Sequence, residues 1–134
     1  MTNLRLLAPE MVLSGLALLV LFVDMLLPVR RARWLYHLAW LCAAGVLVMT
    51  ALTLSGASGA HGVGTLWSVD PFSQFLKMCV LLTTVLCLLL GLDYAGLPER
   101  HAGLFSALVL FSAAGLMFLA SATDLLLVFV ALEL

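Results

Sequence analysis

Charged residues are scarce in this sequence, and the basic ones do not outnumber the acidic ones. Only 10% of its 134 residues are Asp, Glu, Lys or Arg, against about 25% in an average soluble protein. Six basic residues stand against seven acidic ones, so the net charge is -1. Without a basic excess there is no electrostatic case for a nucleic-acid partner. The low charge content also argues against a soluble domain.

Motifs for metals and redox cofactors are lacking as well. Cys42, Cys79 and Cys87 lie singly in apolar runs without a CxxC spacing, and the three histidines are widely scattered. No Gly-rich phosphate loop follows a strand-like run, and no cysteine spacing matches an iron–sulfur ligand set. We therefore expect the cysteines to be small core residues and this chain to bind no metal or cofactor of its own.

Apolar residues dominate instead. They make up 65% of the sequence, which has a mean hydropathy of +1.24, and no soluble core of this size could bury so much apolar surface. Because lipid leaves backbone groups without partners, long apolar runs should be helices, and the runs lack the alternation of a membrane barrel. The sequence predicts an all-α, polytopic transmembrane helix bundle, a single membrane domain over 1–134. Its four full spans are Pro9–Leu27, Trp34–Leu54, Pro71–Leu92 and Gly103–Ala120, and a fifth, truncated span covers 125–134.

The expected helix starts carry acidic residues. The pairs Pro9-Glu10 and Asp70-Pro71 place proline in a first turn beside an acid, and Asp124 precedes the last run. Proline costs little there, the helix dipole favours a negative charge, and aspartate is a good N-cap. Helix initiation is the simplest explanation of these acids.

Basic residues in the loops predict the orientation. The first loop holds Arg30, Arg31 and Arg33 and the third holds Arg100, whereas the second and fourth loops have neither Lys nor Arg. By the positive-inside rule the first and third loops are cytoplasmic, and the N-terminus lies outside. Aromatic residues near the span ends fit an interfacial belt; they are Trp34, Tyr36, Trp67 and Tyr94.

Asp24 and Lys77 are ionisable residues that lie within the spans, beyond the first helical turn. Asp24 lies just before the arginine loop, so snorkelling or pairing with Arg30 or Arg31 accounts for it. Lys77 lies about 9 Å along its helix from Pro71. Snorkelling and a buried functional pair remain equally open for this lysine.

Glu133 is the residue that most strongly indicates a function. It lies about 12 Å along its helix from Leu125, close to the middle of the hydrocarbon core. Its side chain is too short to reach water, and burying the charge there costs about 3 kcal/mol. It should therefore be protonated or have a polar partner, as suits a proton-relay group; a neutral helix–helix hydrogen bond is the alternative. Lys77 reaches a similar depth from the same side, so a Lys77–Glu133 pair is a hypothesis.

A helix that ended at Leu134 would leave its last carbonyls unpaired in the bilayer. We expect either a continuation of the chain or a second chain that completes the bundle.

The sequence "LFSALVLFSAAGLMFLASATDLLLVFVALEL" resembles the fourth and fifth helices of subunit N of respiratory complex I, the proton-pumping NADH–quinone oxidoreductase. "LAPEMVLSGLALLVLFVD" is similar to the first helix of that subunit, and "SVDPFSQFLK" to the start of the third.

The resemblance implies the N-terminal third of an antiporter-like subunit, a large bundle built on an inverted repeat. Glu133 stands where the family has a proton-relay glutamate, whose partner lysine would lie beyond Leu134. The complex would use NADH, FMN, iron–sulfur clusters and quinone in other subunits of a bacterial inner membrane. This chain would contact the other membrane subunits and the lipid bilayer. The Ala-Leu before the glutamate in "VFVALEL" favours subunit N over its sister antiporter-like subunits.

Three functions remain open at this point. The first is a translocase subunit that couples electron transfer to proton relay. The second is a subunit of a cation/proton antiporter without redox chemistry. The third is a non-catalytic membrane scaffold or a truncated remnant.

Overall fold

The computed structural model describes residues 8–26, 32–54, 70–92 and 102–133. The elements within these ranges are α-helices, which confirms the predicted all-α class. In chain order they are α1 (Ala8–Leu26), α2 (Ala32–Leu54), α3 (Pro71–Leu92), α4 (Ala102–Ser121) and α5 (Leu125–Glu133). The first four are long and apolar enough to cross a membrane. This chain is therefore a multi-pass membrane protein.

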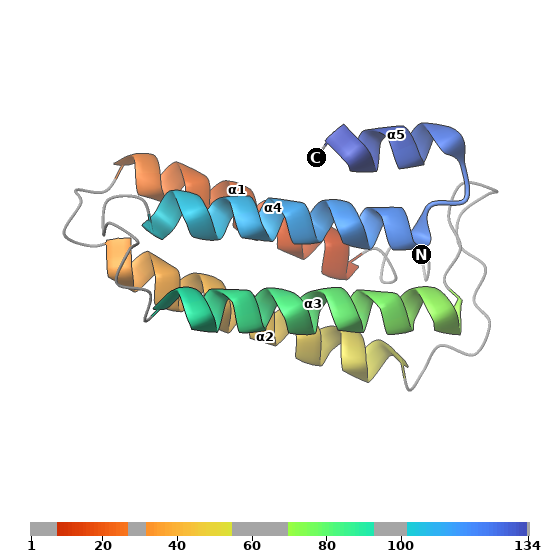
Figure 1. Cartoon of the computed structure of the whole chain (residues 1–134), viewed down its shortest axis with the longest axis horizontal. Coiled ribbons are helices and arrows are strands. Elements are labelled where there is room, and N and C mark those ends of the chain that lie inside the picture. Colours follow the sequence, from red (N-terminus) through yellow and green to blue (C-terminus); the bar gives the residue numbers. More distant parts are fainter. Residues whose placement is uncertain (1–7, 27–31, 55–69, 93–101, 134) are drawn as a thin grey trace.

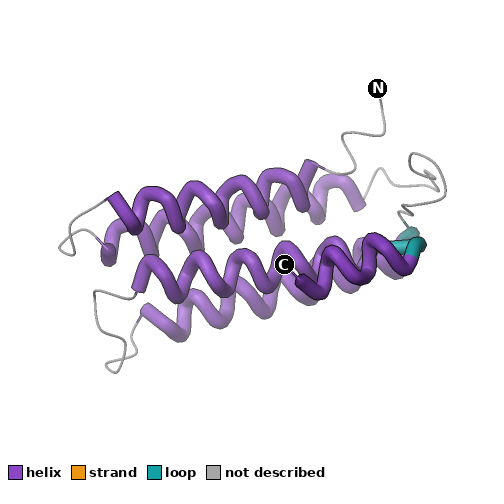
Figure 2. The backbone as a smooth tube through the Cα atoms, turned by 90° about the horizontal axis from the view of Figure 1, so that it is seen from above, coloured by secondary structure: helices purple, strands orange, loops and turns teal. Residues whose placement is uncertain are grey.

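The four long helices form an up-and-down bundle (Figure 1). Helix α4 contacts α1, α2 and α3, and α2 contacts α1 and α3. Helices α1 and α3 thus lie on opposite sides of the bundle interior, and both begin toward the same end of the molecule. After α4 the chain reverses within a few residues, and α5 runs back along the outside of α4 (Figures 1 and 2).

Helix α4 is the most buried element because its inward positions are mostly small. Small side chains let helix backbones approach closely, which is how membrane helices gain packing energy without a hydrophobic driving force. Residues of α4 that are buried include Gly103, Ser106, Ala107, Ala113, Ala114 and Gly115. This composition lets one helix contact all the others in the bundle.

The outer faces of the bundle are apolar. Large side chains that are exposed on this chain occur on every helix; examples are Leu18, Phe22, Leu52, Leu90 and Leu108. In water such a surface would aggregate, whereas in a bilayer it faces hydrocarbon or neighbouring helices. The surface therefore fits the four apolar spans.

Side-chain hydrogen bonds are present at two of the predicted helix starts. The hydroxyl of Ser73 accepts a hydrogen bond from the N–H of Asp70 at 3.1 Å and donates to the carbonyl of Asp70 at 2.9 Å. At the start of α5 the N–H of Leu126 donates to Oδ1 of Asp124 at 3.4 Å. The Asp124 carboxylate therefore caps α5 as predicted, whereas at α3 it is the backbone of Asp70 that bonds with Ser73.

Tyr36 departs from its predicted interfacial place. It is only 2% exposed, and its hydroxyl donates to the carbonyl of Leu88 at 2.7 Å. Gly91 makes the approach possible, because a side chain there would collide with the Tyr36 hydroxyl. A tyrosine near a span end thus joins α2 to α3. Trp34 is exposed as expected, and Trp67 and Tyr94 lie outside the described residues.

The cysteines also differ from the prediction of core positions. Cys79 and Cys87 are exposed and Cys42 is half-buried, and all three are free thiols. In a membrane protein an apolar run does not identify the inward face, because lipid accepts the same side chains as the core. A cysteine in such a run can therefore face either way.

Candidate functional site

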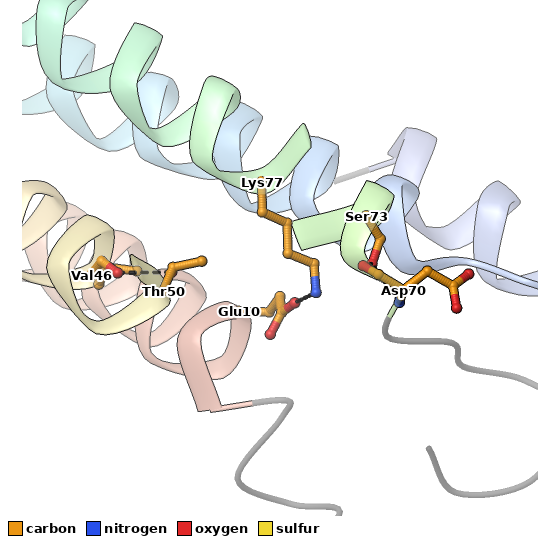
Figure 3. Close-up of polar contacts among 6 residues, drawn as sticks. All are labelled: Glu10, Val46, Thr50, Asp70, Ser73 and Lys77. Carbon is orange, nitrogen blue, oxygen red and sulfur yellow. Dashed lines mark hydrogen bonds and ion pairs between the residues drawn. The ribbon is translucent and has the colours of Figure 1, made fainter. Parts of the chain in front are cut away.

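A buried ion pair joins the starts of α1 and α3. The ammonium nitrogen Nζ of Lys77 lies 2.5 Å from Oε1 of Glu10, and both side chains are fully buried. Figure 3 shows the lysine stem extending from α3 across the bundle interior toward Glu10. The pair therefore connects two helices that lie on opposite sides of the bundle.

The helix geometry explains how the two charges meet. Glu10 lies in the first turn of α1, about 3 Å along the axis from Ala8, whereas Lys77 lies about 9 Å into α3. Helical side chains lean toward the N-terminus of their own helix, and the long lysine stem can cover the remaining distance. The charged groups thus reach one level near the end of the bundle where both helices begin.

The structure places Lys77 in a buried ion pair, one of the two explanations that the sequence left open, but with a partner other than Glu133. The lysine does extend toward the first turn of α3, but its ammonium group meets a carboxylate inside the bundle rather than bulk water. That carboxylate belongs to Glu10, an acid that we had assigned to helix initiation, and the hypothetical pair of Lys77 with Glu133 is not the one formed. Burying either charge alone would be costly, and pairing offsets much of that cost.

The spacing of residues along α1 indicates that Glu10 lies on the inward face of the helix, a point that its assignment to helix initiation left out. The inward positions of α1 include Glu10, Leu13, Ala17 and Val20, a spacing of three and four residues that marks one face of a helix. Glu10 continues this apolar stripe. An acid on such a stripe is expected to need a partner inside the bundle.

Further polar groups lie near this ion pair. Gln74, one turn before Lys77 on the buried face of α3, is 1% exposed, and Thr50 of α2 is fully buried. The Thr50 hydroxyl donates to the carbonyl of Val46 at 2.8 Å (Figure 3). Among the described residues, Oε2 of Glu10 and Oε1 of Gln74 have no hydrogen-bond partner. The end of the bundle is thus more polar inside than its middle.

Glu133 lies apart from this ion pair, on α5. Its side chain is exposed on the described part of the chain, whereas Ala131, two residues earlier, is buried. Two residues correspond to a rotation of about 200° around a helix. When Ala131 faces the bundle, Glu133 therefore faces away from it. The predicted burial of Glu133 is not provided by the helices described.

Asp24 lies at the other end of α1, against α4. Any side chain added at Gly103, in the first turn of α4, would overlap the Asp24 carboxylate. A carboxylate at a helix N-terminus is favoured by the helix dipole. This contact accounts for Asp24 within the bundle; the predicted partners Arg30 and Arg31 lie outside the described residues.

A shallow groove of about 440 Å³ runs between α3 and α4. Its lining is mostly apolar with a few hydroxyl and thiol groups; it includes Cys79, Thr83, Cys87, Phe105, Ser112 and Leu116. Charged side chains are absent from this lining. The groove itself therefore offers no charged group for a charge-based function.

Comparisons with known proteins give a consistent result. The chain is 35% identical to NADH-quinone oxidoreductase subunit N 2 of Koribacter versatilis, over 94% of this chain and 27% of that protein. It is 32% identical to NADH-quinone oxidoreductase subunit N of Trichlorobacter lovleyi, over 98% of this chain and 27% of that protein. It is also 32% identical to F(420)H(2) dehydrogenase subunit N of Methanosarcina mazei, over 100% of this chain and 28% of that protein.

No protein-family model matches the chain. It spans about 27% of the length of the curated relatives that it matches, although the similarity extends over nearly all of the chain itself. The multiple matches, together with the four membrane-spanning helices, confirm the resemblance to subunit N of the NADH–quinone oxidoreductases.

Proposed function

We propose that this chain is part of a membrane subunit of a proton-translocating NADH:quinone oxidoreductase and that Glu133 relays protons in it. The similarity to subunit N sequences, which extends over nearly the whole chain, is the observation that carries the proposal. The apolar four-helix bundle supports it, because proton translocation requires a membrane-spanning scaffold. The location of the chain in a bacterial inner membrane, with its N-terminus on the outer side, belongs to the same proposal.

The position of Glu133 supports a role that involves further helices. It lies about halfway into a bilayer from the start of α5, and it faces away from α4. A charged partner from another helix would meet it there in a medium of low dielectric constant, where Coulomb interactions are strong. Binding or release of a proton at Glu133 would then change the proton affinity of neighbouring groups.

Electron transfer belongs to other subunits in this proposal. One relative is named as a subunit of an F(420)H(2) dehydrogenase and the others as subunits of NADH–quinone oxidoreductases. Similarity over this part of the protein therefore does not depend on the electron donor. NADH, FMN, the iron–sulfur clusters and the quinone would act on subunits with which this chain assembles.

Replacing Glu133 with glutamine tests the relay. We expect Glu133→Gln to preserve assembly and electron transfer while losing most of the coupled proton pumping, because the amide cannot take up or release a proton. The measurement is proton uptake per electron in inverted membrane vesicles. Asp124→Asn is the matched control, since it makes the same chemical change at the start of the same helix.

The outcomes separate the three functions. Full pumping by Glu133→Gln would remove this residue from the mechanism and favour a scaffold. Proton movement that depends on this chain but persists with a quinone-site inhibitor would indicate a cation/proton antiporter. Pumping that is lost in the variant and abolished by the inhibitor in the wild type supports the redox-driven translocase.

A further inference from the structure

Two buried oxygen atoms beside the Glu10–Lys77 pair are without hydrogen-bond donors in the described part of the chain. Glu10 contacts Lys77 through Oε1, which leaves Oε2 unpaired, and Oε1 of Gln74 is unpaired as well. The side chains that carry them are 0% and 1% exposed. Both atoms are hydrogen-bond acceptors when Glu10 is ionised.

Unpaired polar atoms in such surroundings are rare in folded proteins. The large majority of buried polar side-chain atoms bond to protein or to ordered water, because burial without a partner forfeits the hydration of the free group. A carboxylate oxygen carries charge, so its need for a donor is the greater. Some donor is therefore expected at this position.

The two acceptors lie at nearly the same level of the bundle. Gln74 precedes Lys77 by three residues on the buried face of α3. The stem of Lys77 runs from its own turn toward the start of α3 and across to Glu10 (Figure 3). Because one helical turn spans about 5.4 Å, this course brings the ammonium group to the level of Gln74.

We propose that Glu10, Gln74 and Lys77 bind a buried water molecule at the end of the bundle where α1 and α3 begin. Water suits the pattern because it has two O–H donors for two unpaired oxygens and is small enough for a closed site. A metal cation suits it less, since the ammonium of Lys77 already neutralises the Glu10 carboxylate. The ligand is thus a neutral donor.

A bound water would give the Glu10–Lys77 pair a route for taking up a proton, which a pair without water lacks. A proton carried by the water could bind Oε2 of Glu10, leaving the water neutral and changing the net charge of the Glu10–Lys77 pair from zero to +1. Asp70 and Asp124 are the other described acids at this end, and Asp70 points away from the lysine (Figure 3). This site does not depend on the role proposed for Glu133.

A density map of the intact assembly that contains this chain, at a resolution where waters are visible, tests the proposal. We expect a water within about 3.2 Å of both Oε2 of Glu10 and Oε1 of Gln74. Gln74→Leu should lose this density. Thr84→Val is the matched control and should keep it, because Thr84 lies on the same buried face and its hydroxyl already donates to the carbonyl of Val80.

Infrared spectroscopy of the same assembly provides a second measurement that does not require the Gln74 variant. The carboxylate band of Glu10 is identified as the band lost in Glu10→Gln. A hydrated carboxylate should shift its band within minutes of transfer from H₂O to D₂O, whereas a dry one should not. An unshifted band would overturn the proposal, and so would a map in which a protein group occupies the site or no density lies between the two oxygens.

Discussion

At the scale of single residues, the Glu10–Lys77 pair shows how a membrane bundle accommodates charge. Lys77 lies within an apolar span and is fully buried, yet its partner comes from the first turn of a helix on the opposite side of the bundle. A buried pair is not in itself strong evidence of stability, because desolvation offsets the Coulomb attraction. The removal of one partner, however, leaves an uncompensated charge inside the bundle.

Single substitutions of the pair should therefore be more harmful than the double substitution. In soluble proteins, removing one member of a buried pair costs about 3–5 kcal/mol, and we expect Lys77→Met to destabilise the subunit by a comparable amount. Adding Glu10→Gln should restore part of the loss, because no buried charge then remains. Thermal unfolding of the purified assembly, analysed as a double-mutant cycle, measures this coupling.

The same cycle with Glu133 distinguishes the two candidate partners of Lys77. Lys77→Met and Glu133→Gln should be additive within about 0.5 kcal/mol, as expected for residues that do not interact. A larger coupling between Lys77 and Glu133 than between Lys77 and Glu10 would contradict the ion pair seen in the structure.

At the scale of helices, the contact between α1 and α4 depends on the absence of a side chain. The carboxylate of Asp24 occupies the space that a residue other than glycine would fill at position 103. Asp24 and Gly103 can both be read from the sequence, but their contact cannot be predicted from it. Nothing in either helix specifies which neighbour that helix packs against. Close approach of backbones through small residues is a general means of membrane-helix association.

Gly103→Ala should thus weaken the packing of α1 on α4. We expect lower thermal stability of the assembly, with partial recovery when Asp24→Ala removes the colliding carboxylate. Gly15→Ala is the matched control, since a side chain at Gly15 of α1 would meet no atom within 4 Å. That variant should be neutral or slightly stabilising, because alanine favours helix more than glycine by about 1 kcal/mol. Equal effects of the two substitutions would show that the Asp24 contact has no role.

At the scale of the whole molecule, α5 lies outside the four-helix bundle and contacts it through α4. It packs against α4 and presents large apolar residues and Glu133 outward. The curated relatives are nearly four times as long as the region matched here, so the proteins that this chain resembles have much additional structure. The proposed relay through Glu133 is consequently a property of the assembly.

Orientation in the membrane is predicted from loop charge and can be measured directly. With Cys42, Cys79 and Cys87 replaced by alanine, a membrane-impermeant thiol reagent added to intact cells should label Thr2→Cys. It should label Pro28→Cys, in the arginine-rich first loop, only after the membrane is opened. The reverse pattern would place the N-terminus in the cytoplasm and overturn the positive-inside assignment.

The sequence by itself determined the class of the protein, its four spans and the starts of α3 and α5. These features are local: the length of an apolar run, the scarcity of charge, and an aspartate before a helix act within one segment. The sequence also singled out Lys77 and Glu133, because charge within an apolar run stands out wherever the run packs.

Only the tertiary structure decided which groups meet. It paired Lys77 with Glu10, set Asp24 against Gly103, buried Tyr36, and turned Glu133 away from the bundle. The physical reason is that the lipid-facing and inward-facing sides of a membrane helix are both apolar, because apolar side chains suit both lipid and core. Neighbours are then selected by shape and by a few polar contacts between segments far apart in sequence, and local patterns carry little of that information.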